Sequence, residues 1–228
     1  MRQIFGHQNA RVLSRTVPGL CVALGIALMG TTVHTQSALS QTSTSSVAVT
    51  VAPAQVSIAH HDAKPTKGWV RFCQQRPEEC AVDLSEPDTI KLTAKAWQTF
   101  VHVNRQVNGA IKPATDQEHW GEEDRWDFAE DGYGDCEDYQ LVKRRELIKL
   151  GFPRRALRMT VVIDETGAGH AVMMVRTDRG EFVLDNKHNS VLPWNQTGYT
   201  YIKREDDHGA AWASLGGTVA SPVATAGR

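Results

Sequence analysis

One stretch in the middle of the chain has the hydrophobic period of an amphipathic helix. Between residues 89 and 107 the apolar positions lie three or four apart, at Leu92, Ala96, Phe100, Val103 and Val107. We expect Asp88 or Thr89 to cap the start of this helix. Asn104 and Asn108 lie near its end, and we expect them to cap the terminus; the alternative is that they orient a neighbouring loop.

A second helix is predicted after Gly132 and Gly134, two glycines that allow a tight turn and leave room around the side chain that follows. Asp135 is a good N-cap residue, and Gly151 can end the helix. Its later turns carry basic residues, which suit the helix dipole there: Lys143, Arg144, Arg145 and Lys149. The helix therefore presents Cys136 in its first turn.

After Gly151 the hydrophobic period changes to two, which is typical of β-strands. Strands are expected over residues 157–163, 170–176, 181–185 and 199–203. Residues 164–169 and 177–180 are rich in Asp, Gly and Thr, so we expect them to be turns. The first three strands therefore form two successive hairpins.

The segment from residue 112 to 131 is acidic and aromatic, and we expect a loop with one short helical turn. Its Trp120 and Trp126 either line a substrate groove or cover the edge of the core. Its carboxylates are oxygen ligands of the kind that calcium prefers, although the spacing of an EF-hand loop is absent.

The first 38 residues have the layout of a secretory signal peptide. Arg2, Arg11 and Arg15 precede an uncharged apolar stretch, residues 17–29, that is too short for a comfortable transmembrane span. This interpretation predicts export to the periplasm, an oxidising compartment. An uncleaved amphiphilic anchor is the alternative.

Composition defines the remaining boundaries. Residues 39–66 are rich in Ser, Thr, Val and Ala and are expected to form a disordered arm, and residues 206–228 a flexible tail. The ordered domain is therefore predicted to span residues 67–205. The formal net charge of -1 and the hydrophobic content of 41% indicate neither a nucleic-acid-binding surface nor global disorder.

The chain has four cysteines, which differ in their surroundings. Cys21 lies in the apolar stretch and would be removed with the signal peptide. Cys73 and Cys80 flank a turn with a proline and are the natural disulfide pair, which leaves Cys136 free. A zinc ligand pair is the alternative for Cys73 and Cys80, but six intervening residues exceed the usual spacing.

Cys136 lies in a mixed electrostatic environment. The N–H groups and the dipole of a helix N-terminus favour a thiolate. The carboxylates of Asp135, Glu137 and Asp138 oppose it. Activation of this thiol would therefore need a histidine partner, or a cation that neutralises the acids; a buried structural cysteine is the alternative.

The second hairpin brings His170 and Asp185 together if its turn is symmetric. Arg176 then faces Glu181, and Val172 faces Asp185. Since His170 is two residues from Val172, His170 and Asp185 become diagonal neighbours on one face, with backbones roughly 7–8 Å apart. A carboxylate on one imidazole nitrogen leaves the other nitrogen free to face a thiol, as in nucleophile–base–orienter sites. A structural His–Asp hydrogen bond is the alternative.

At these residues the chain resembles the bacterial transglutaminase-like cysteine peptidases, whose best known members are the LapG-type periplasmic proteases. The motifs that carry the resemblance are Gly134-Asp135-Cys136-Glu137-Asp138, Gly169-His170-Ala171 and Leu184-Asp185-Asn186. The segment from Trp69 to Cys80 is also similar to the family, as are Asn108 and Trp126, so the resemblance covers about residues 67–205.

The resemblance implies a papain-like, transglutaminase-type α+β fold, in which N-terminal helices pack on an antiparallel β-sheet. It implies that Cys136 is the nucleophile, His170 the general base and then the acid, and Asp185 the orienting residue. It also implies a Ca²⁺ ion at Asp135 and Glu137, which would neutralise the acids beside the thiol.

The resemblance also suggests partners. LapG-type proteases cut a large secreted adhesin and release cells from biofilms, so a protein substrate of this kind is expected. An inner-membrane regulator is a further expected partner. The chain itself is expected to be a monomer that binds no nucleic acid.

Other functions would use the same residues. The acyl group could pass to an amine, or the chain could act as an amidase on cell-envelope peptides. A non-catalytic calcium-binding interaction domain is a second alternative. Zinc held by Cys136, His170 and Asp185 is a third; the ligand types suit zinc, but no closely spaced ligand pair supports it.

Overall fold

The computed structural model describes residues 56, 58, 60–206, 208 and 211–219. The predicted signal peptide, and the predicted arm up to residue 55, lie outside the described residues. No helix in the described part of the chain combines the length and the apolar character that a membrane crossing requires.

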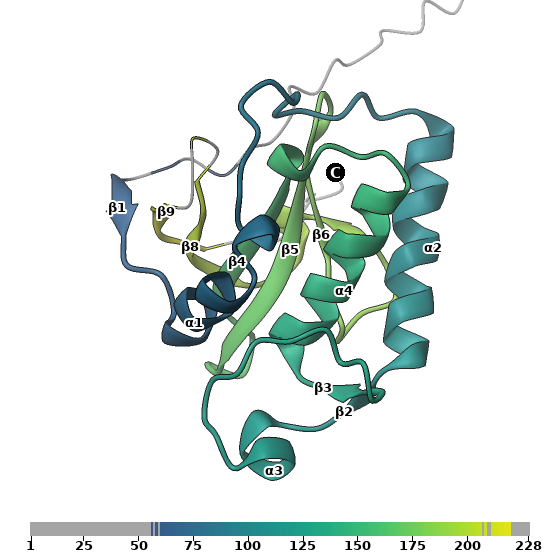
Figure 1. The fold of residues 1–228 in the computed structure, drawn as a ribbon. Helices are drawn as coiled ribbons and strands as arrows, with labels where there is room; N and C mark the ends of the chain where they lie inside the picture. The colour runs from purple at the N-terminus through teal and green to yellow at the C-terminus, as the bar shows by residue number, and fades with distance from the viewer. Residues whose placement is uncertain (1–55, 57, 59, 207, 209–210, 220–228) are drawn as a thin grey trace, which may run out of the picture. The chain divides into compact units, whose positions relative to one another are not determined.

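After one short strand, the helices come before most of the other strands along the described chain (Figure 1). The helices are α1 (Lys67–Gln75), α2 (Ala94–Ala110), α3 (Asp116–Trp120) and α4 (Cys136–Lys149), with short 3₁₀ turns at Pro77–Glu79, Arg154–Ala156 and Trp194–Gln196. The strands are β1 (His60–Ala63), β2 (Lys112–Pro113), β3 (Tyr133–Gly134), β4 (Leu157–Ile163), β5 (Gly169–Thr177), β6 (Gly180–Leu184), β7 (Leu192–Pro193), β8 (Thr200–Glu205) and β9 (Trp212–Val219).

Seven strands form one sheet in the order β1-β9-β8-β4-β5-β6-β7, and every neighbouring pair is antiparallel. β2 and β3 form a separate parallel pair, which fixes the loop before α4. Each of the four predicted strands is present, and the two predicted hairpins are β4–β5 and β5–β6. Helices packed on an antiparallel sheet confirm the predicted α+β class.

The first predicted helix begins later than expected. Thr93 is its N-cap, and its hydroxyl oxygen accepts a hydrogen bond from the amide of Ala96 at 3.1 Å. The prediction that Asp88 or Thr89 caps the helix is wrong, because the chain before Thr93 is extended: Ile90 forms an isolated bridge with Thr177 in β5. The pairing of Ile90 with the sheet therefore keeps the residues before Thr93 out of the helix, although their hydrophobic period is helical.

Successive residues of β5 point to opposite faces of the sheet and divide the core in two. Met173 and Val175 pack in the cluster that includes Phe100 of α2 and Leu147 of α4. Figure 1 shows these two helices side by side against the sheet. Val172 and Met174 face the other way, into a cluster that also includes Val183, Tyr199, Tyr201 and Leu215.

A disulfide joins Cys73 at the end of α1 to Cys80, with the two Cα atoms 5.6 Å apart. Cys136 is the free cysteine of the described residues. The predicted cysteine pairing is therefore confirmed. The disulfide lies beside a third apolar cluster, in which α1 packs on α4, β4 and β9.

Two segments that composition assigned to the arm and the tail belong to the sheet. His60–Ala63 forms the edge strand β1, and Trp212–Val219 forms β9 between β1 and β8. For these residues the prediction is wrong. The small residues of β9 resemble a flexible tail in composition, but Trp212, Ala213 and Leu215 are at most 1% exposed, so burial of the strand outweighs its composition.

The basic run of α4 is not a solvent-exposed row of charges. Arg144 is buried and pairs with Glu205 at 2.7 Å, and Glu205 also accepts a hydrogen bond from the indole of Trp69 at 2.8 Å. Burial alone would raise the pKa of Glu205, but Arg144 and Arg154 outweigh it and hold this pKa at about 2. The ion pair fastens the middle of α4 to β8, and so holds the helix that carries Cys136 against the sheet.

The burial of β9 predicts a large cost for removing its aromatic side chain. Trp212 packs edge-on against Trp69, with ring centroids 5.7 Å apart. Trp212→Ala should therefore lower the free energy of unfolding by about 3–5 kcal/mol, measured by urea denaturation. Trp120, which is 38% exposed, is the matched control, and Trp120→Ala should cost less than about 1 kcal/mol. Equal costs would contradict the place of β9 in the folded sheet.

Candidate active site

The loop before α4 has room for its acids only because it contains glycine. A Cβ atom at Gly134 would lie 2.7 Å from Asp138 Oδ2, too close for any other residue without a shift. The same Oδ2 accepts a hydrogen bond from the amide of Asp135, the N-cap residue, at 3.3 Å. The predicted N-cap is confirmed, and Gly134 makes room for the carboxylate of Asp138. Cys136 follows as the first residue of the helix.

The sulfur of Cys136 lies between an acid on its own helix and the free end of β5. Its thiol donates to Glu137 Oε2 at 3.1 Å, and the amide of Ala171 donates to the sulfur at 3.3 Å. β6 pairs with β5 only as far as Met173, opposite Leu184, so the Ala171 amide has no strand partner on that side. The thiol occupies the place that a longer β6 would fill.

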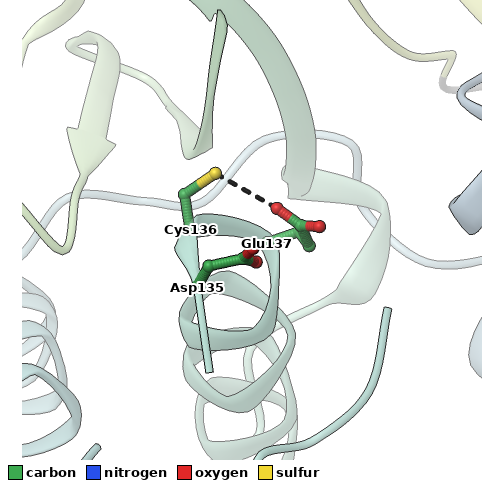
Figure 2. A group of neighbouring side chains, drawn as sticks. All are labelled: Asp135, Cys136 and Glu137. Atoms are coloured by element: carbon green, nitrogen blue, oxygen red, sulfur yellow. Dashed lines mark hydrogen bonds between the residues drawn. The ribbon is translucent and has the colours of Figure 1, made fainter. Parts of the chain in front are cut away.

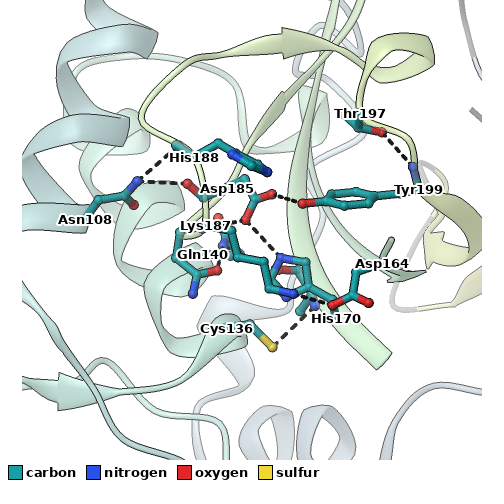
Figure 3. Close-up of polar contacts among 12 residues, drawn as sticks. Asn108, Cys136, Gln140, Asp164, His170, Asp185, Lys187, His188, Thr197 and Tyr199 are labelled. Atoms are coloured by element: carbon teal, nitrogen blue, oxygen red, sulfur yellow. Dashed lines mark hydrogen bonds and ion pairs between the residues drawn. The ribbon is translucent and has the colours of Figure 1, made fainter. Parts of the chain in front are cut away.

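His170 and Asp185 are neighbours, as the register of the hairpin predicted. Arg176 pairs with Glu181, and Met173 pairs with Leu184. The imidazole Nε2 of His170 lies 2.9 Å from Asp185 Oδ1, and both residues are buried (Figure 3). Since Asp185 engages Nε2, the second ring nitrogen, Nδ1, is left for another partner.

The structure brings Cys136 to the backbone beside His170, because Ala171 directly follows His170 in β5. Among the described residues, the hydrogen bonds of the sulfur are to Glu137 and Ala171, and none joins it to the imidazole. Burial raises the pKa of the Cys136 thiol well above its ordinary value, and the charge of Glu137 raises it further. The thiol in this state is therefore protonated at neutral pH.

The backbone around Asp185 is held from α2. Asn104 is fully buried; its Oδ1 accepts from the amide of Asp185 at 3.1 Å, and its Nδ2 donates to the carbonyl of His188 at 2.8 Å. Asn108 donates to the carbonyl of Asp185 at 2.9 Å. The prediction that these asparagines cap the helix is wrong, because α2 continues to Ala110; they orient the loop that follows β6.

The carboxylate of Asp185 has further partners. Oδ1 also accepts from the amide of Lys187 at 2.9 Å, and Oδ2 accepts from the hydroxyl of Tyr199 at 2.7 Å. Burial favours the protonated carboxyl, but the hydrogen bonds from His170, Tyr199 and Lys187 outweigh it and hold the pKa of Asp185 below its ordinary value. The sequence pattern identified Tyr199 only as the start of a strand, and no motif marks it.

The acids beside the thiol crowd one another (Figure 2). Ligand atoms of Asp135, Cys136 and Glu137 lie within 4.8 Å of one another, and so do those of Asp116, Asp135 and Asp138. Burial raises the pKa of Asp116 to about 6 and that of Asp138 to about 8, and neighbouring carboxylates add to both shifts. Burial and the charge of Asp135 likewise raise the pKa of Glu137.

This cluster fits a divalent cation with oxygen ligands. Within the described part of the chain, no lysine or arginine forms an ion pair with Asp116, Asp135, Glu137 or Asp138. Asp135 Oδ1 is buried and has no hydrogen-bond partner among the residues that the structure describes. Buried carboxylates that lack a cation are costly, and clustered carboxylate oxygens are the ligands that calcium prefers. Asp135 and Glu137, the residues predicted from the family resemblance, belong to this cluster.

The two tryptophans of the acidic loop have different roles. Trp126 is 5% exposed and packs in the cluster of α1, α4 and β9, so it covers the edge of the core. Trp120 is partly exposed and lines a surface cavity of about 270 Å³ together with Arg76, Arg125 and Phe128. The core-edge interpretation is therefore confirmed for Trp126, and a substrate groove at Trp120 stays a prediction.

A thiol at a helix tip beside a His–Asp pair on an antiparallel sheet defines the class of papain-like, transglutaminase-type cysteine enzymes. Comparison with known families agrees. The sequence model of the bacterial transglutaminase-like cysteine proteinases matches residues 59–220. The chain belongs to this family, so the predicted family and fold class are confirmed.

Solved structures of LapG from Legionella pneumophila are similar to the chain. The calcium-bound form is 24% identical with a TM-score of 0.46, and the match covers 57% of this chain and 73% of LapG. The EGTA-treated form is 25% identical with a TM-score of 0.45, over 55% of this chain and 69% of LapG. No match to a curated protein was found.

The acid cluster predicts that the cation-free protein loses stability as the pH rises. Unfolded aspartates ionise near pH ~3.9, whereas folded Asp116 and Asp138 have pKa values of about 6 and 8. Between these values the folded chain keeps protons that the unfolded chain has lost, so its stability falls from about pH 4 to pH 8. In EGTA, the Tm should be about 5 °C or more lower at pH 8 than at pH 5.

Asp138→Asn should reduce this pH dependence, because it removes the carboxylate with the larger pKa shift. Glu123→Gln, at an exposed position of the acidic segment 112–131, is the control and should leave the pH dependence of the Tm unchanged. A Tm in EGTA that is constant between pH 5 and pH 8 would contradict the raised pKa values.

Proposed function

We propose that this chain is an exported cysteine endopeptidase whose catalytic triad is Cys136, His170 and Asp185. One arrangement carries the proposal: the thiol accepts a 3.3 Å hydrogen bond from the residue after His170, and His170 Nε2 lies 2.9 Å from a buried Asp185. Membership of a cysteine proteinase family supports the reaction class.

In the first half of the reaction, His170 takes the thiol proton on Nδ1, while Asp185 holds Nε2. The sulfur of Cys136 attacks the peptide carbonyl carbon, and the carbonyl oxygen becomes an oxyanion. The amide of Cys136 is in the first turn of α4, where helix N–H groups lack helical acceptors, and it would donate to this oxyanion.

The intermediate collapses when the C–N bond breaks and His170 passes its proton to the leaving amine. A thioester between Cys136 and the acyl part of the substrate remains. In the second half, His170 removes a proton from water, which attacks the thioester carbonyl. The C–S bond then breaks, the carboxylic acid leaves, and the thiol regains its proton.

We further propose a calcium site at Asp135 and Glu137, with Asp116 and Asp138 as neighbouring acids. When bound, the ion supplies positive charge beside the thiol. Glu137 accepts a hydrogen bond from the Cys136 thiol at 3.1 Å. If Glu137 bound the ion instead, the imidazole of His170 would be the group left to accept the thiol proton. The lower negative charge around Cys136 would also lower the pKa of the thiol.

The proposed substrate is a large secreted adhesin, and the proposed compartment is the periplasm, where an inner-membrane protein would regulate access. The cysteine, histidine and aspartate motifs resemble those of the LapG-type proteases, and this resemblance supports the choice. The disulfide between Cys73 and Cys80 suits an oxidising compartment.

The nucleophile is tested by replacing its sulfur. Purified protein is incubated with candidate secreted adhesins and Ca²⁺, and the products are examined by gel electrophoresis and mass spectrometry. Cys136→Ala and Cys136→Ser should each lower the cleavage rate by a factor of about 10⁴ or more, because no thioester can form. Both variants should keep the Tm of the wild type within a few degrees.

Undiminished cleavage by either variant would end the proposal. New termini that carry a free carboxylate indicate hydrolysis, whereas substrate joined to an added primary amine would indicate acyl transfer instead. The thiol can also be followed without substrate, because Cys136 is the free cysteine of the described residues and iodoacetamide labels it.

The metal is tested by chelation. EGTA should abolish both cleavage and fast alkylation of Cys136, and added Ca²⁺ should restore them, because the carboxylates around the thiol are then neutralised. A zinc-selective chelator should have no effect. Asp135→Asn and Glu137→Gln should each weaken Ca²⁺ binding by ten-fold or more in calorimetry, while Glu123→Gln should not. Full activity in EGTA would refute the calcium site.

A further inference from the structure

The carboxylate of Asp185 is held by a side chain that no sequence motif marks. The hydroxyl of Tyr199 donates to Asp185 Oδ2 at 2.7 Å, and Tyr199 is 0% exposed. Figure 3 shows the tyrosine hydroxyl pointing at one oxygen of the carboxylate, while the bond to His170 involves the other oxygen. A buried hydrogen bond of this length to an ionised oxygen is among the stronger single contacts in a protein.

Tyr199 also contacts the histidine itself. Its ring packs edge-on against the imidazole of His170, with centroids 5.8 Å apart and planes at 81°. Tyr199 lies just before β8, which pairs with β4 and β9, whereas Asp185 follows β6. The tyrosine therefore reaches the His–Asp pair from a different part of the sheet.

Without Tyr199 the orientation of the carboxylate would be incompletely determined. Asn104 and Asn108 hold the backbone of Asp185, and His170 and the Lys187 amide both contact Oδ1. Oδ2 would then be a buried charged oxygen with no partner among the described residues. A carboxylate in this condition rotates toward other donors or takes up a proton, and either change weakens its bond to His170.

We propose that Tyr199 is a positioning residue for the proposed peptidase reaction, and that its hydroxyl fixes the Asp185 carboxylate so that His170 keeps Nε2 on Asp185 and presents Nδ1 to Cys136. This inference rests on the proposed function. Tyr199 acts through Asp185 and touches neither the thiol nor the reacting carbonyl.

Tyr199→Phe tests the hydroxyl, and Tyr201→Phe is the matched control. Tyr201 is equally buried in the same cluster, but its hydroxyl bonds to Thr197 Oγ1 at 3.1 Å and the Trp194 carbonyl at 3.2 Å. Tyr199→Phe should lower kcat by about ten-fold with KM unchanged, as expected for one hydrogen bond to a charged group. Tyr201→Phe should change kcat less than two-fold. Equal effects on kcat, or a loss confined to KM, would overturn the proposal.

A second readout needs no substrate. In a Cys136→Ala background, the imidazole proton between His170 and Asp185 should give a low-field ¹H NMR signal, assigned by its loss in His170→Gln. Tyr199→Phe should shift or broaden this signal, and Tyr201→Phe should leave it in place. An unchanged signal in Tyr199→Phe would overturn the proposal. If wild-type protein cleaves no adhesin, the proposed function fails, while this experiment still decides the role of Tyr199.

The dependence of Tyr199 on Asp185 is tested by a double-mutant cycle. In Asp185→Asn the amide keeps a single acceptor oxygen, so the hydroxyl no longer holds a carboxylate. Adding Tyr199→Phe to this variant should lower kcat less than two-fold further, against about ten-fold in the wild type. Full additivity would show that Tyr199 acts elsewhere. If Tyr199→Phe alone lowers the Tm, the double-mutant cycle and the NMR signal still distinguish positioning of Asp185 from a loss of stability.

Discussion

The bond from the Ala171 amide to the sulfur of Cys136 is the contact on which the site depends, since it joins a helix to the open end of a strand. It exists because β6 ends at Leu184, two residues before it would cover Ala171. Gln140, one turn after Cys136, donates to the carbonyl of the same residue at 3.4 Å. Both backbone groups of Ala171 on this side therefore bind α4, and the early end of β6 sets where the thiol meets the sheet.

The buried carboxylates of this fold are of two kinds, those paired with an arginine and those without such a partner. Glu205 and Glu181 are buried against arginines, at 2.7 Å from Arg144 and 2.6 Å from Arg204, and each pair ties distant elements together. The acids beside Cys136 have no such partner in the described chain, and the pKa of Asp138 rises to about 8, mainly through burial. Within one domain, some buried carboxylates are therefore paired with arginines and stabilise the fold, whereas the carboxylates beside Cys136 lack such a partner and form the proposed calcium site.

The sequence predicted the hairpin of the site well, because strand registers follow from turn symmetry and a period of two. His170 and Asp185 could be paired from that alone. It could not predict that Asn104 binds the loop after β6, because the capping and loop-binding roles of asparagine look the same along a chain. The contact of Tyr199 with Asp185 could not be predicted either, because a tyrosine in a strand pattern is usually an ordinary core residue. β9 was missed because its burial comes from distant partners and its composition does not reveal it.

The pairing of β1 with β9 has a consequence for the order in which the chain can fold. The hairpins β4–β5 and β5–β6, which carry His170 and Asp185, are local and can form early. The strands β1 and β9 come from opposite ends of the described chain, and Trp212 of β9 packs edge-on against Trp69 of α1. A chain emerging from a ribosome cannot close this sheet until β9 is free to pair. The domain would therefore complete its sheet only after β9 has been synthesised.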